Sequence, residues 1–158
     1  MTEMSSKIKE AWMNFQLDKE HLMAQKLFRD FAQNEVEPIA QEIDEEHRFP
    51  DETVAKMQQY GLLGIPFAKE LGGQGCDTLT YVLAIEEISK VCATTGVILS
   101  AHTSLGSEPI NKNGTPEQKE KFLRPLISGK RLGAFGLTEP EAGTDAAGQQ
   151  TTAKLVGD

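Results

Sequence analysis

The chain has 158 residues, of which 39% are hydrophobic and 25% charged, and its formal net charge is −8. This composition is typical of a globular domain, or of one domain plus a piece of another. The negative charge argues against a nucleic-acid-binding function, because a phosphate backbone requires a basic surface. No apolar run reaches the length of a membrane span, which argues against a membrane protein. Neither a signal-peptide pattern nor a typical transit peptide opens the chain, so the sequence predicts a cytoplasmic protein.

The first predicted element is a long helix that follows a polar N-terminal extension, residues 1–12. Asp18 is suited to the N-cap position of this helix. Apolar side chains then recur at three- to five-residue steps as far as Ile43, which gives one continuous apolar stripe. Pro38 interrupts the pattern, and we expect it to kink or break the helix.

Further helices are predicted to follow after short loops. The 94–107 segment is apolar nearly all round, as a helix buried in a core would be. Thr115 precedes Pro116 and can form a capping box with Gln118, which predicts a strong helix start. The predicted helices after the first span 49–61, 77–91, 94–107 and 115–129, with a glycine-rich loop over 64–75.

The character of the chain changes near Gly129. Residues 132–137 and 149–156 mix apolar and β-branched side chains with glycine or polar neighbours, which predicts two strands. Helices first and strands second indicate an α+β fold class. Because two strands alone rarely make a stable sheet, the second unit is expected to be the truncated start of a larger β domain.

The most specific motif is GAFGLTEPEAGTDAAG over residues 133–148. It resembles the signature of the acyl-CoA dehydrogenases, flavoenzymes that desaturate acyl thioesters. The residues that occupy the fixed positions of that signature are Gly136, Leu137, Thr138, Glu139, Ala142, Gly143, Thr144, Asp145 and Gly148. A chance match at so many constrained positions is far rarer than a chance match to a lone glycine motif.

The resemblance covers most of the chain from Met13 onward. NFQLDKEHL, EIDEEHRFP, YGLLGIPFAKELGGQG, EEISKVCATTGVILSAHTSL and GTPEQKEKFL look like the bacterial short-chain members, the butyryl-CoA dehydrogenases. The resemblance implies a helical N-terminal domain over 13–129 and the truncated start of a β-barrel-like middle domain over 130–158. It therefore identifies the chain as an N-terminal fragment of such an enzyme.

The same resemblance implies an FAD cofactor and assigns residues to it. The backbone at Phe135 and Leu137, together with the Thr138 hydroxyl, would contact the flavin ring. Thr144 matches the position that hydrogen-bonds the acyl-CoA, and Gly143 allows close backbone approach to that ligand. Such contacts tune the cofactor, whereas the redox chemistry belongs to the flavin.

No residue of this chain is assigned as catalytic. In the family the catalytic base comes from the C-terminal domain, so Glu139 is interpreted as a carboxylate that orders the turn. Glu141 fills a position where many relatives carry Gly or Asn, and it adds negative charge near a polyanionic ligand. His102 lacks a partner at metal-ligand spacing, and it is interpreted as a structural or pocket-lining residue rather than a metal ligand.

The function implied is desaturation of a short-chain acyl-CoA such as butyryl-CoA to the 2-enoyl-CoA, with electrons passing to electron-transferring flavoprotein. Two alternatives stay open. One is a non-catalytic remnant or helical binding module that lacks flavin, and the other is the oxidase or monooxygenase chemistry that also occurs on this scaffold. Full-length relatives are mostly tetramers through a C-terminal bundle, so a homo-oligomer is expected for the family and is undecided for this chain.

Overall fold

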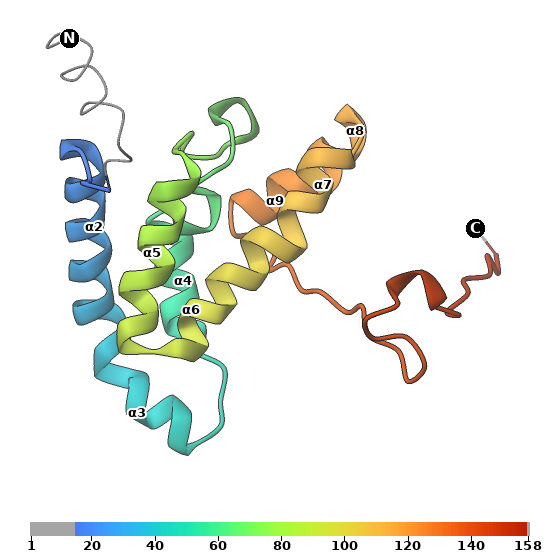
Figure 1. Cartoon of the computed structure of the whole chain (residues 1–158), viewed down its shortest axis with the longest axis horizontal. Coiled ribbons are helices and arrows are strands. Elements are labelled where there is room, and N and C mark those ends of the chain that lie inside the picture. The colour runs from blue at the N-terminus through green and yellow to red at the C-terminus, as the bar shows by residue number, and fades with distance from the viewer. Residues whose placement is uncertain (1–14, 158) are drawn as a thin grey trace, which may run out of the picture.

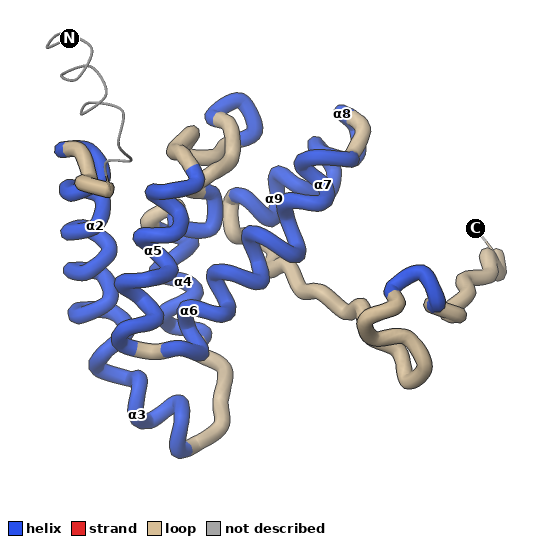
Figure 2. Tube along the Cα trace, in the orientation of Figure 1, coloured by secondary structure: helices blue, strands red, loops and turns tan. Residues whose placement is uncertain are grey.

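The computed structural model describes residues 15–157, and these form a bundle of helices followed by an extended C-terminal segment (Figures 1 and 2). The predicted extension over 1–12 lies outside the described residues. The α-helices are, in chain order, α2 (Lys19–Phe31), α3 (Glu37–Glu45), α4 (Asp51–Gln59), α5 (Thr78–Val91), α6 (Ala93–Ser100), α7 (Glu108–Asn113), α8 (Pro116–Gln118) and α9 (Arg124–Ile127).

The predicted long helix is present but divided. The Asp18 side chain accepts a hydrogen bond from the His21 backbone N–H, which confirms Asp18 as the N-cap of α2. The break comes at a π-helical segment, η1 (Ala32–Val36), and Pro38 lies in the first turn of α3. The chain stays helical through this division, because the Glu37 backbone N–H donates to the Ala32 carbonyl in a π-helical bond, and Pro38, which has no N–H, lacks only its own bond of this kind.

The middle of the bundle is built on the pairing of α5 with its neighbours. Asp77 caps α5 by accepting a hydrogen bond from the Thr80 backbone N–H. The helix packs against α2 on one side and α6 on the other. Gly96 makes the second contact possible, because a Cβ at that position would lie 1.9 Å from the Ser89 hydroxyl oxygen.

The predicted helices over 94–107 and 115–129 also contain π-helical turns. After α6 the chain continues through η4 (Ala101–Ser107) into α7, and α8 continues through η5 (Lys119–Leu123) into α9. The Thr115–Gln118 capping box is confirmed, with both of its reciprocal hydrogen bonds formed. Gly129 adopts a left-handed conformation with φ of 71° directly after α9, as a glycine that ends a helix does.

One hydrophobic cluster occupies the centre of the bundle and a smaller one lies beside it. The central cluster is formed by Phe28, Phe31, Ala32, Val36, Met57, Leu62, Leu63, Ile65, Tyr81, Leu83, Ala84, Ile88 and Leu99. The smaller cluster joins the 64–75 loop to the last helix through Phe67, Leu123 and Ile127. Burial of these side chains removes apolar area from water and is the main stabilising contribution to the bundle.

The two predicted strands are not formed. Within residues 15–157 the structure contains no strand, and the only strand-like pairing is an isolated bridge between Glu139 and Ala142. Residues 132–137 and 149–156 run as extended chain away from the bundle (Figure 2). A strand requires backbone hydrogen bonds to a neighbour, and in the described residues neither segment has such a neighbour. The α+β prediction is therefore confirmed only in its helical part.

Candidate functional site

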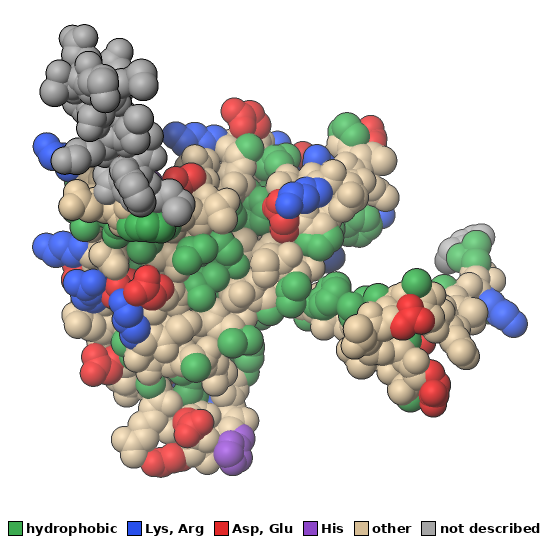
Figure 3. Space-filling model, in the orientation of Figure 1, with side chains coloured by type: hydrophobic (Ala, Val, Ile, Leu, Met, Phe, Trp, Pro, Cys, Tyr) green, Lys and Arg blue, Asp and Glu red, His purple; other side chains and the backbone are tan. Residues whose placement is uncertain are grey.

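The residues of the signature lie on the extended segment that follows α9. Phe135 is 51% exposed and Leu137 is 41% exposed, and Thr138, Gly143 and Thr144 are also exposed residues. Figure 3 shows hydrophobic side chains along the connection between the bundle and this segment. The structure therefore places all five predicted site residues on one accessible segment.

A tight turn within the signature is held together by Glu139. Its backbone exchanges hydrogen bonds with Ala142, at 3.1 and 3.2 Å. The carboxylate accepts hydrogen bonds from the backbone N–H groups of Gln150 at 2.7 Å and Thr151 at 3.1 Å. These bonds, the one from Gln150 first, lower the pKa of Glu139. The prediction that this carboxylate orders the turn is confirmed, and a carboxylate held in its ionised form by two N–H groups is unsuited to act as a proton shuttle.

The segment begins against the π-helical turn η4. The Gly133 backbone N–H donates to Nδ1 of His102 at 2.9 Å. Gly133 also packs against Gly106, where an added Cβ would lie 3.0 Å from the Gly133 Cα. The connection therefore depends on one buried imidazole and on two glycines that allow close backbone approach.

His102 is fully buried, as the interpretation of a structural or pocket-lining residue requires. Burial lowers its pKa, while the backbones of Leu63 and Leu126 oppose part of that shift. Because Nδ1 accepts a hydrogen bond, the neutral ring carries its proton on Nε2. Among the described residues Nε2 has no hydrogen-bond partner of good geometry, and the same holds for the buried hydroxyls of Thr103 and Ser107.

The helix predicted over 94–107 is not buried all round. Leu99 lies in the central cluster, whereas Val97 is 63% exposed and Leu105 is 44% exposed. The apolar side chains of this helix therefore face the core on one side and solvent on the other. No cavity is closed over this open face by the described residues.

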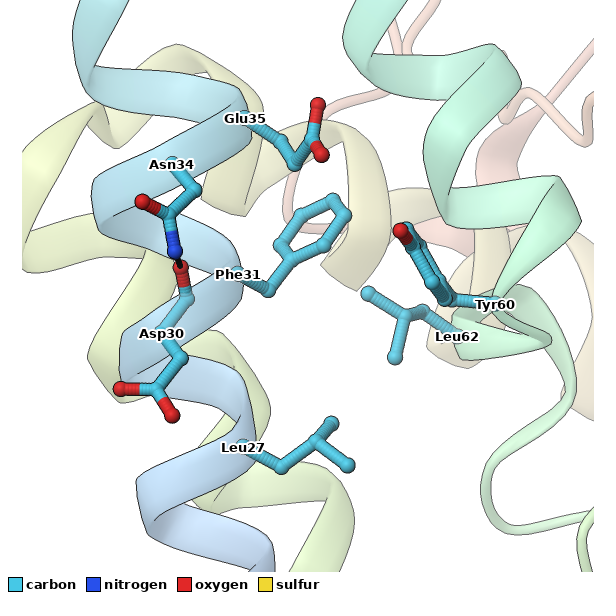
Figure 4. A pocket seen from close by; sticks show the side chains of 7 residues that line it. All are labelled: Leu27, Asp30, Phe31, Asn34, Glu35, Tyr60 and Leu62. Atoms are coloured by element: carbon cyan, nitrogen blue, oxygen red, sulfur yellow. Dashed lines mark hydrogen bonds between the residues drawn. The ribbon is translucent and has the colours of Figure 1, made fainter.

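An open groove of about 260 Å³ lies elsewhere on the bundle, between α2–η1 and the chain that follows α4 (Figure 4). Phe31 and Tyr60 meet edge to face in it, with ring centroids 5.9 Å apart. Leu27 and Leu62 provide the other apolar lining, and polar side chains form the rim. None of the signature residues lines this groove.

A buried charge cluster was missed by the sequence analysis. Glu87 is 3% exposed, and its carboxylate accepts hydrogen bonds from Gln25 at 3.0 Å, Arg29 at 2.9 Å and Lys90 at 2.8 Å. Its pKa is lowered to about 2, first by the Arg29 hydrogen bond. Glu86, the neighbouring residue, is exposed, and its carboxylate pairs with the same Lys90 ammonium at 2.8 Å. In the sequence, the signal for this cluster was that Arg29 follows Gln25 by one helical turn, which places both side chains on one face of a helix. The sequence alone does not show which other helix that face meets.

The histidines other than His102 lie apart from one another and from any metal-binding group in the part of the chain that the structure describes. His21 is half-buried and bridges the carboxylates of Asp18 and Asp77, each at 2.9 Å. His47 is exposed and adopts a left-handed φ of 54°. Across residues 15–157 no group of three or more potential ligands is placed to hold a metal ion. None of the described helices is long and apolar enough to cross a membrane.

Comparison with known proteins defines the class. Residues 18–130 match the family described as Acyl-CoA dehydrogenase, N-terminal domain. The chain therefore belongs to the acyl-CoA dehydrogenase family.

Its relatives point to the short-chain members of that family. The chain is 60% identical over 146 residues to a protein of Clostridium acetobutylicum called short-chain specific acyl-CoA dehydrogenase, covering 92% of this chain and 38% of that protein. The solved structure of butyryl-CoA dehydrogenase from Megasphaera elsdenii matches with a TM-score of 0.82 and 44% identity, over 88% of this chain and 37% of that one. An acyl-CoA dehydrogenase complexed with FAD from Bacillus anthracis matches with a TM-score of 0.80 and 35% identity, over 90% and 25% of the two chains. The chain thus spans well under half the length of these relatives.

Proposed function

We propose that this chain is the N-terminal part of an FAD-dependent acyl-CoA dehydrogenase that desaturates a short-chain acyl-CoA, such as butyryl-CoA, to the 2-enoyl-CoA. The observation that carries the proposal is the 60% identity to a short-chain specific enzyme, maintained over 92% of the chain. We further propose that residues 13–129 form the helical domain and that residues 130–158 begin the middle domain of such an enzyme. Electron-transferring flavoprotein is the proposed electron acceptor.

The proposed flavin contacts are the backbone of Phe135 and Leu137 and the hydroxyl of Thr138. The fit is supported by the accessibility of this segment, which lies outside any strand or helix and presents its polar groups to solvent. When bound, the flavin supplies the acceptor for the hydride that leaves the substrate β-carbon. The chain's own residues bind and orient the ring, because hydrogen bonds to its polar edge fix its position relative to the thioester.

The proposed acyl-CoA contacts are Gly143 and Thr144, beyond the Glu139 turn. Both are exposed, and Gly143 has no heavy atom within 4 Å of the place a Cβ would occupy. A thioester or phosphopantetheine group can therefore approach the backbone there. We assign no catalytic base within this chain, since Glu139 is engaged in ordering the turn.

Ligand titration tests these assignments. The purified chain is titrated with FAD, followed by flavin fluorescence, and then with butyryl-CoA. Loss of one hydrogen bond in Thr138→Val should weaken FAD binding roughly two- to tenfold, and Thr144→Val should weaken acyl-CoA binding by a similar factor. Thr152→Val, at an exposed position outside the proposed contacts, is the matched control.

Activity is tested on the polypeptide purified from its native cells. Oxidation of butyryl-CoA with an artificial dye or electron-transferring flavoprotein, without oxygen consumption, is the expected result. Oxygen consumption would instead indicate oxidase or monooxygenase chemistry. A protein that takes up neither flavin nor acyl-CoA would be a helical binding module, and the proposed function would be wrong.

A further inference from the structure

The C-terminal segment has a single hydrogen-bonded attachment to the bundle beyond Arg131. Within residues 15–157, the Gly133 N–H bond to His102 Nδ1 is the only hydrogen bond that joins any residue from 133 onward to the helices. The other hydrogen bonds of this segment are internal, such as those made by the Glu139 carboxylate. The geometry at Gly133 therefore decides where the rest of the segment starts.

His102 is well suited to hold this point. Its side chain is 0% exposed, so water does not compete for the Nδ1 acceptor. The ring belongs to η4, which continues without a break from α6 into α7 and contacts α9 and the 62–64 turn. On the other side, the Gly106 and Gly133 backbones lie so close that a Cβ on either would come within 3.3 Å of the other residue. The donor is thus held by contact as well as by the hydrogen bond.

The attachment lies very near the proposed flavin contacts. Phe135 follows Gly133 by two residues, which is at most about 7 Å of extended chain. A change in the direction of the backbone at Gly133 would therefore displace the backbone groups of Phe135 and Leu137. Positional errors of about 1 Å are enough to weaken hydrogen bonds to a rigid ligand.

We propose that His102 is a positioning residue: by accepting the Gly133 N–H, it fixes the start of the 133–138 segment on η4 and so sets how that segment meets the flavin. This inference rests on the proposed function for its second half. The first half, the attachment of Gly133 to His102, concerns this chain alone and is measured without any cofactor.

The variants separate the acceptor from the bulk of the side chain. His102→Leu fills the buried space but removes the acceptor. His102→Asn keeps an oxygen that can take the place of Nδ1, so it should restore the attachment. Thr103→Val is the matched control, because it removes a neighbouring buried hydroxyl that has no hydrogen-bond partner in the described residues. Gly106→Ala displaces Gly133 while leaving His102 intact, and it serves if His102→Leu does not fold.

Amide exchange of the chain without cofactor tests the attachment. We expect the Gly133 N–H to exchange about fivefold faster in His102→Leu and in Gly106→Ala, because each loses or weakens one hydrogen bond. His102→Asn and Thr103→Val should stay close to the unmodified chain. Unchanged exchange at Gly133 in both His102→Leu and Gly106→Ala would overturn the proposal.

Flavin titration of the same proteins tests the consequence. We expect weaker FAD binding and a shifted flavin visible spectrum in His102→Leu and Gly106→Ala, with both restored in His102→Asn. Faster exchange at Gly133 with unaltered FAD affinity and spectrum would overturn the positioning role while leaving the proposed function standing. If the unmodified chain binds no FAD, the proposed cofactor site fails and the positioning role with it, whatever the exchange rates show.

Discussion

The helical bundle and the C-terminal segment, residues 130–157, are stabilised in different ways although they belong to one continuous chain. Helices satisfy their own backbone hydrogen bonds, so each needs only one packed apolar face to become stable. The segment after α9 has strand-like composition but no neighbouring strand among the described residues. Its large apolar side chains stay exposed, Leu155 and Val156 at 92% each. The contrast shows that a family's most diagnostic sequence need not lie in its best-packed region.

The largest effect is expected when the same substitution is made once in the bundle and once in the C-terminal segment, which tests whether side chains of the segment contribute to the free energy of unfolding. Leu99→Ala should lower the free energy of unfolding by about 2–5 kcal/mol, because it leaves a cavity in the central cluster. Leu137→Ala, the same change on the segment, should cost less than about 0.5 kcal/mol. Chemical denaturation followed by circular dichroism measures both. Equal costs would show that the segment is packed as firmly as the bundle.

The second prediction concerns the buried carboxylate between α2 and α5. Glu87→Gln should destabilise the bundle by about 1–3 kcal/mol, because Arg29 and Lys90 lose a charged acceptor. Both cations are half exposed, and screening by water therefore limits the size of this effect. Glu86→Gln is the control and should change stability by less than about 0.5 kcal/mol.

The pH dependence of Glu87 gives a further check on the same cluster. Because folding lowers its pKa from 4.5 to about 2, its contribution is complete above the unfolded value and is lost as the pH falls through that interval. The stability difference between the unmodified chain and Glu87→Gln should therefore shrink in acid. A difference that is independent of pH would contradict the charge pairing.

A smaller effect is expected where His21 joins the caps of α2 and α5. The hydrogen bond to Asp77, and then that to Asp18, raise the pKa of His21 above 6.5. A raised pKa means that the contribution is fully present below pH 6.5 and is lost as the pH rises through the folded value. The unfolding midpoint of the unmodified chain should thus exceed that of His21→Gln in mild acid. The difference between the two midpoints should disappear at alkaline pH.

The smallest effect on stability is expected at the signature turn. Glu139→Gln should leave the unfolding midpoint of the bundle unchanged, since the turn does not pack on the core. The Gln150 and Thr151 amides should nevertheless exchange faster, because the carboxylate that accepts their hydrogen bonds is replaced by a weaker acceptor. A global loss of stability in this variant would show that the two regions are coupled more strongly than the contacts indicate.

Local signals in the sequence predicted the helices well. Asp18, Asp77 and Thr115 each begin a helix through a side-chain hydrogen bond to a backbone N–H two or three positions into it. The π-helical turns were not predicted, since they keep the same apolar periodicity as an α-helix and differ only in backbone pairing. The strands were predicted from composition and are absent, because composition shows a preference for pairing and cannot supply a partner.

The sequence by itself determined the family, the helix starts after Asp18, Asp77 and Thr115, and the order of the helices that they begin, because the signature and the caps depend on residues close together in the chain. The tertiary structure decided which groups separated in sequence meet. Only packing brings Glu87 to Arg29, His21 to Asp77, and His102 to Gly133 thirty-one residues later. These pairs depend on the relative placement of helices, which is set by the summed burial of many side chains rather than by any local motif.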